Sequence, residues 1–106
     1  MSRIFSLYTV ICEVKMADGT VEPLTVEKLD AHWLENLMFA QPKNFDKCVE
    51  FIRNVDLEKT YPILYGITGD LSYNDMEKMY GDYDSLGYDE KLLVTIYRLR
   101  ALKNLV

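Results

Sequence analysis

Apolar and polar residues alternate near the start of the chain, and further on the apolar residues recur at helical spacing. From residue 4 to residue 16 the side chains are largely β-branched or aromatic, with alternation in the second half, which predicts a long strand. Asp18-Gly19 supplies a turn, and residues 21–25 return as a shorter strand. Because Pro23 cannot donate a backbone hydrogen bond, this second strand should lie at an edge of the sheet.

Two amphipathic helices and a third strand are predicted next. After Thr25, which can cap a helix, apolar residues recur at helical spacing up to the break at Gln41-Pro42. Asn44 offers a second cap, followed by another apolar stripe with a polar opposite face. Residues 61–68 are short and apolar, and they end in the turn-forming pair Gly69-Asp70. This pattern predicts a strand packed beside the first one.

The last part of the chain predicts two more helices. Ser72 and Asp75 have the spacing of a capping box, which begins a short helix that stops at Gly81. Asp89 can cap a long final helix with acidic residues at its start and basic ones near its end, the order that the helix dipole favours. The elements follow in the order ββααβαα. We therefore expect an α+β fold and a single domain over residues 1–106, with a small, mainly antiparallel three-stranded sheet packed by about four helices.

Composition is that of an ordinary folded domain, with 49% apolar and 27% charged residues among 106. The net charge of −5 argues against nucleic acid or an anionic membrane as the direct ligand, because both are polyanions that are bound through Lys and Arg. The apolar runs are shorter than a membrane-spanning helix needs. With only two cysteines and no signal peptide ahead of the fold, we expect a cytoplasmic location.

The negative charge is concentrated in residues 70–90, which we call the acidic segment. It has seven acidic residues and one lysine, whereas the rest of the chain has ten acidic and eleven basic residues. Four tyrosines lie among the carboxylates, and tyrosine is enriched at interfaces because it offers a large, rigid contact area with a polar tip. The residues expected to bind a basic protein partner are Asp70, Asp75, Glu77, Tyr80, Asp82, Tyr83, Asp84, Tyr88, Asp89 and Glu90. A simpler interpretation is that these acids are solvated and only stabilise two helix N-termini.

Two functional hypotheses follow. The first is a non-enzymatic binding protein that occludes a basic surface on another protein. It would act as a phage-encoded inhibitor of a host nuclease or defence complex, whose carboxylates imitate phosphates, or as an immunity protein that covers a basic toxin nuclease. The second is a structural or regulatory subunit that associates through residues 92–106, where apolar residues extend beyond one stripe and a homodimer is plausible.

Catalytic chemistry has little support in the sequence. His32 is the only histidine, and it lies one position off the predicted apolar stripe. Cys48 lies on a buried stripe, where a thiol is normally inert. We therefore expect no enzyme, and a small enzyme would be reconsidered only if His32 faced a cleft with carboxylates nearby.

Metal and cofactor sites are not indicated either. The three Cys and His residues are scattered, without the paired spacing of a structural zinc site. An EF-hand-like spacing begins at Asp82 but fails at its fifth and twelfth places, where Leu86 and Leu93 stand. We expect no cofactor, and weak binding of a divalent ion by Asp82, Asp84 and Asp89 stays open.

Overall fold

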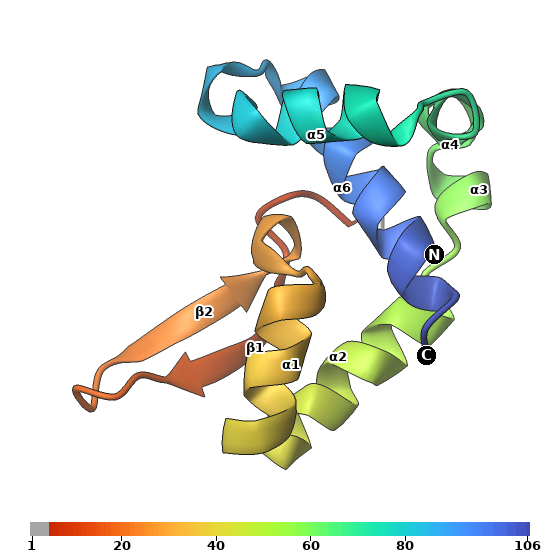
Figure 1. Cartoon of the computed structure of the whole chain (residues 1–106). Helices are drawn as coiled ribbons and strands as arrows, with labels where there is room; N and C mark the ends of the chain where they lie inside the picture. Colours follow the sequence, from red (N-terminus) through yellow and green to blue (C-terminus); the bar gives the residue numbers. More distant parts are fainter. Residues whose placement is uncertain (1–4) are drawn as a thin grey trace.

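A computed structural model describes residues 5–106 and contains one antiparallel hairpin (Figure 1). β1 (Val10–Lys15) pairs with β2 (Val21–Thr25). In the turn between them Gly19 has a φ of 88°, a conformation that glycine adopts without steric cost. The first strand, at residues 10–15, is shorter than the predicted residues 4–16. Its predicted start at Ile4 lies outside the described residues, and Leu7 is buried in a non-strand segment ahead of β1.

The predicted third strand is wrong, because the sheet of residues 5–106 has two strands. Side-chain amides occupy the outer edge of β1 instead. Gln41 Nε2 donates a hydrogen bond to the Lys15 carbonyl at 3.0 Å, and Asn44 Nδ2 donates one to the Glu13 carbonyl at 2.9 Å. These carbonyls have partners without another strand, and this also protects the edge from pairing with other chains.

Helices make up most of the described chain and accompany the β-hairpin, so the α+β class is confirmed. The predicted number of about four helices is wrong. Within residues 5–106 the α-helices are α1 (Ala31–Ala40), α2 (Pro42–Asn54), α3 (Leu57–Thr60), α4 (Pro62–Thr68), α5 (Tyr73–Gly81) and α6 (Tyr88–Lys103). Two short 3-10 helices, η1 (Val26–Lys28) and η2 (Tyr83–Ser85), lie in the connections. None of the helices in the described range is long and apolar enough to cross a membrane.

Residues 61–68, predicted as a strand, contain helix α4. Pro62 occupies the first helical turn, where its fixed φ is favourable and its missing N–H costs nothing. Leu64 and Tyr65 pack against the core, while Ile63 and Ile67 are exposed. This spacing has the helical period. A short, almost wholly apolar run cannot be assigned to strand or helix by its hydrophobic periodicity alone, which is why the prediction failed.

The predicted helix starts agree with the structure in one case. Ser72 accepts a hydrogen bond from the Asp75 backbone N–H, and the Asp75 side chain accepts one from the Ser72 backbone, so the predicted capping box is confirmed. Asp89 is not an N-cap. The final helix begins at Tyr88 with Gly87 as its N-cap, two residues earlier than predicted, and Asp89 lies in its first turn.

The first two helices also begin elsewhere than predicted. Thr25 is followed by η1, and Asp30 caps α1 by accepting a hydrogen bond from the Trp33 N–H at 3.0 Å. The second helix, α2, begins at Pro42 rather than after Asn44. Proline again takes a position that needs no N–H donor.

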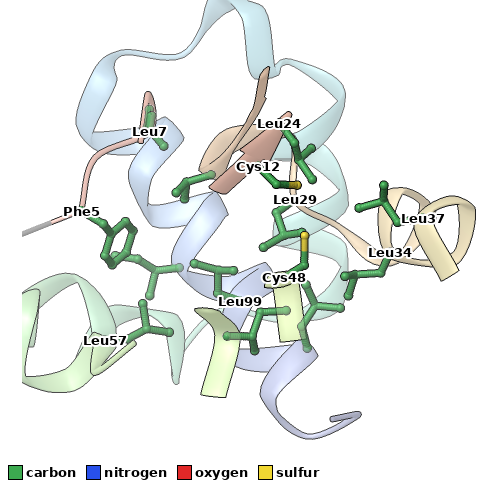
Figure 2. Close-up of a cluster of buried hydrophobic side chains, with 14 of the residues drawn as sticks. Phe5, Leu7, Cys12, Leu24, Leu29, Leu34, Leu37, Cys48, Leu57 and Leu99 are labelled. Carbon is green, nitrogen blue, oxygen red and sulfur yellow. The ribbon is translucent and has the colours of Figure 1, made fainter. Parts of the chain in front are cut away.

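Helix α6 runs through the middle of the molecule and contacts η1, α2, α4 and α5 (Figure 1). Because several elements cover it, its apolar residues are not confined to one stripe. Figure 2 shows the central cluster, which contains Leu99 of α6 together with Leu29, Leu57 and Cys48. The buried side chains of α6 are Leu92, Val94, Thr95, Ile96, Leu99 and Leu102.

Candidate functional site

The acidic segment forms one end of the molecule, where the turn before α5, α5 itself, η2 and the first turn of α6 follow one another (Figure 1). Its seven carboxylate side chains are all exposed to solvent. They are Asp70, Asp75, Glu77, Asp82, Asp84, Asp89 and Glu90. The structure therefore gathers these residues at one end, as their closeness in the sequence requires.

The charges of the acidic segment are not neutralised by basic side chains of the described chain. Between residues 5 and 106 the only ion pair joins Arg98 to Asp30, which lies outside the segment. Asp75 is used in the capping box, and Glu77 accepts a hydrogen bond from the Tyr73 hydroxyl at 2.7 Å. That bond raises the pKa of Tyr73. A field of negative charge thus faces the solvent, where it can attract a cationic surface.

The tyrosines of the acidic segment differ in their surroundings. Tyr80 and Tyr88 are 50% and 45% exposed, and Tyr73 is still more open. Tyr83 is half-buried, and its hydroxyl lies 3.4 Å from Glu27 Oε2. Burial first, and the neighbouring Glu27 carboxylate second, raise the pKa of Tyr83. Tyr80 and Tyr88 can therefore contact a partner, whereas Tyr83 mainly fixes the segment to the rest of the protein.

Arg98 of α6 contacts two tyrosines of the acidic segment, and sequence reasoning did not identify it. Its guanidinium lies 5.0 Å from the ring centre of Tyr80 and 5.8 Å from that of Tyr83. The same group donates to the Glu27 carbonyl at 3.1 Å and to Asp30 Oδ2 at 3.4 Å. We call these five residues the Arg98 cluster. Cation–π contacts and charge-assisted hydrogen bonds stabilise such an arrangement when it is shielded from water.

Tyr8 is a second residue that the sequence did not indicate. It is 66% exposed, and its ring lies 6.3 Å from that of Tyr88, centre to centre, with the planes tilted by 39°. The two tyrosines come from opposite ends of the chain, so no local pattern could predict their pairing. Together they place two partly exposed phenol rings at the start of α6.

A cleft of about 540 Å³ lies between α5, α6 and the start of α1. Its lining includes the large apolar side chains Met76, Tyr80, Leu102 and Leu105. This volume is within the range of small-molecule pockets, which is roughly 300 to 1,000 Å³. The cleft therefore has room for several apolar groups.

His32 lines the same cleft as Asp30 and Glu77. A cleft that places His32 near carboxylates is the arrangement for which a small enzyme was to be reconsidered. His32 Nε2 lies 3.3 Å from the Asn36 amide nitrogen on the next turn of α1, and Asp30 is already paired with Arg98. The described residues that line the cleft include no Ser, Thr or Cys. A histidine without such a nucleophile lacks the arrangement of acyl transfer based on Ser, Thr or Cys.

The two cysteine thiols face one another in the core, one on β1 and one on α2 (Figure 2). Burial, together with the neighbouring Cys12 thiol, raises the pKa of Cys48 to about 12. Cys48 is therefore a neutral thiol at ordinary pH, and it lacks the thiolate that a nucleophile or metal ligand requires.

Nowhere in residues 5–106 do three or more His, Cys, Asp or Glu side chains form a group that could hold a metal ion. Asp82, Asp84 and Asp89 are included in that range. Comparisons of the chain with models of protein families, with curated proteins and with solved structures found no match.

Proposed function

We propose that this chain is a non-enzymatic binding protein that covers a basic surface on a protein partner. The observation that carries the proposal is the exposure of seven carboxylates at one end, without a basic side chain of the described residues paired to them. Carboxylates arranged in this way increase the rate of encounter with a positive surface and disfavour other partners. The partially exposed rings of Tyr80 and Tyr88 supply contact area beside the charges.

Two settings fit this proposal, and both require the same chemistry. In one, the protein inhibits a nuclease or defence complex by taking the place of phosphates, as a phage inhibitor would. In the other, it is an immunity protein that neutralises a basic toxin nuclease. The proposed location is the cytoplasm, which is supported by two buried cysteines that are present as free thiols.

The proposal is tested by reversing charge at two places on the molecule. One variant changes Asp82, Asp84 and Asp89 to Lys, and the control changes the exposed Glu13, Glu22 and Asp46 to Lys on the hairpin and α2. Each variant gains six units of charge, two per reversal, so the formal net charge moves from −5 to +1 in both. The two proteins therefore differ only in where the charge was changed.

The measurement is affinity capture of basic proteins from a lysate at low and high salt, followed by calorimetry with the purified binder. The first variant should lose about 100-fold or more in affinity, because close interfacial charge pairs contribute several kcal/mol together. The control should stay within about threefold of the wild type. Equal losses in both variants would mean that only net charge matters and would contradict a specific acidic surface.

The second function, a structural or regulatory subunit that associates through residues 92–106, stays a prediction. Most apolar residues of α6 are in the core, and Leu105, which is 75% exposed, is the observation that still favours it. Light scattering after size-exclusion chromatography at high micromolar concentration tests it. A strict monomer there would argue against this function.

A further inference from the structure

The cleft between α5 and α6 is apolar at its base and open at its rim. Met76 and Leu102 are buried there, whereas Tyr80 and Leu105 remain 50% and 75% exposed. Leu105 follows α6 and is among the most exposed large apolar residues of the described chain. An exposed leucine beside an apolar hollow is typical of a surface that another molecule covers.

The cleft also borders the acidic segment, because α5 belongs to both. Glu77 lines the cleft and is exposed, and Asp82 follows directly after Gly81, which lines the cleft as well. The one basic side chain among the lining residues apart from His32 is Arg98. Its Nη1 and Nη2 are bonded to Asp30 and the Glu27 carbonyl, its guanidinium lies over two tyrosine rings, and its Nε is buried. A molecule that enters the cleft therefore meets negative charge at its rim and no free positive charge.

We propose that the cleft receives apolar side chains from a basic amphipathic helix of the protein partner. This inference rests on the proposed function and adds to it the form of the contact: lysines or arginines face the acidic segment, while leucine-like residues one turn apart enter the cleft. Helices bind grooves in this way through apolar residues at positions i, i+3, i+4 and i+7. Affinity then comes mainly from a few buried anchors, with charges that orient the helix.

Two other occupants fit the cleft less well. A small molecule needs a few polar groups that fix its orientation, but two ionic groups of the lining, Arg98 and Asp30, already bind one another. A second copy of this chain would bring its own acidic segment toward the first, and juxtaposed like charges disfavour such a complex. A basic helix has neither difficulty.

The test uses a synthetic helical peptide with leucines along one face and lysines along the other, labelled with a fluorophore. Two matched peptides replace the leucines with serine or the lysines with glutamate. Binding to the full-length protein is measured by fluorescence anisotropy at two salt concentrations. The leucine–lysine peptide should bind, and each matched peptide should bind at least about tenfold more weakly, since an apolar anchor or the charge match has been removed.

Three variants locate the binding site. Ala101 lines the cleft and is exposed, so the large ring of Ala101→Trp should obstruct the cleft and weaken binding about tenfold or more. Leu105→Ser removes an apolar contact and should weaken binding about fivefold. Ile63→Ser is the matched control, because Ile63 on α4 is 78% exposed and does not line the cleft. It should change affinity less than twofold. Circular dichroism checks that all three variants are folded.

The outcomes separate this inference from the proposed function. If the serine peptide binds as well as the leucine peptide, or if Ala101→Trp leaves affinity unchanged, the cleft is not the docking site. The acidic surface would still stand if the Asp82, Asp84 and Asp89 reversal weakened binding. If that reversal had no effect while Ala101→Trp did, the proposed function would be wrong. Failure of the leucine–lysine peptide to bind at high micromolar concentration, or tight binding of the glutamate peptide, would overturn the inference.

Discussion

The central helix and the acidic segment are built on opposite principles. Helix α6 has six buried side chains and is covered by four other elements. In residues 70–87, Met76 is the one buried side chain. Tyr80 and Tyr83 add contacts with Arg98, and Tyr83 also contacts Lys91 and Glu27. One region supplies stability through apolar burial, and the other presents charge with little burial of its own.

This contrast indicates how a small domain can keep seven uncompensated carboxylates at one end. Repulsion among them works against compactness, but it acts on a segment that contributes little to the core. Helix N-termini offset part of the repulsion, because Asp75 lies in the first turn of α5 and Asp89 and Glu90 in that of α6. Substitutions in the two regions should therefore differ in how much stability they cost and in how far their effects spread through the structure.

Leu99→Ala tests the central helix and should have the largest effect. Leu99 is fully buried in the cluster of Figure 2, and truncation of a buried leucine leaves a cavity that costs about 2 to 5 kcal/mol of stability. Urea unfolding should show this loss as one cooperative transition. Ile63→Ser, on an exposed site, is the control and should change stability by less than about 0.5 kcal/mol. A loss as small in Leu99→Ala would contradict the assignment of α6 as the centre of the core.

Arg98→Ala tests the junction between the two regions. It removes the ion pair to Asp30, the bond to the Glu27 carbonyl and the contacts with two tyrosine rings. We expect a loss of about 1 to 3 kcal/mol in the free energy of unfolding. Hydrogen exchange should accelerate more in α5 than in α2.

Two further variants sharpen that test. Arg98→Lys keeps the charge but lacks the planar group that donates to two acceptors and stacks on rings, so it should recover only part of the loss. Arg53→Ala, at an exposed site in the last turn of α2, should cost less than about 0.5 kcal/mol. If exchange in α5 were unchanged by Arg98→Ala, the buried Met76 and the contacts of Tyr83 with Glu27 and Lys91 would hold the acidic segment without Arg98.

Local sequence patterns predicted the elements whose signals are themselves local. The Ser72–Asp75 capping box depends on residues three apart, and the hairpin depends on alternation and on the turn at Gly19. Both are confirmed. The strand predicted at residues 61–68 is wrong because a short apolar run has no unique period, and its helical form depends on packing against α6.

The surroundings of the candidate site could be predicted only in part. The acidic segment is continuous in the sequence, so we could expect its carboxylates to lie in one region of the molecule. The Arg98 cluster, the Tyr8–Tyr88 pair and the cleft join residues that are far apart along the chain. No periodicity encodes such contacts, because they depend on how finished helices pack. The partner-binding role of the ten predicted residues stays a prediction.

The buried thiols predict a pH dependence that belongs to the core alone. Because the pKa of Cys48 is raised from 9.0 to about 12 in the folded protein, the unfolded chain loses this proton first as the pH rises. Its contribution to stability is therefore complete below about pH 9 and declines from there to about pH 12. Linkage gives a loss of about 1 kcal/mol at pH 10. Chemical denaturation of the wild type and Cys48→Ala at pH 8 and pH 10 measures it.

In that experiment the variant should lose about 1 kcal/mol less than the wild type between the two pH values. The comparison cancels the titration of lysines and tyrosines that both proteins share. A parallel decline in the two proteins would show that the thiol is accessible to water or already able to ionise in the folded state.

Ser72→Ala should have the smallest effect and the most local one. It removes the hydroxyl that accepts a hydrogen bond from the Asp75 N–H at 3.1 Å, a loss of about 1 kcal/mol for a capping residue. Since α5 contributes little to the core, the loss should appear as faster hydrogen exchange at the start of α5, with the exchange of α6 unchanged. Ser85→Ala, at an exposed position of η2, is the control and should leave both unchanged. If Ser72→Ala accelerated exchange in α5 and α6 equally, the two regions would unfold as one unit, and the contrast between them would be one of composition without a difference in local stability.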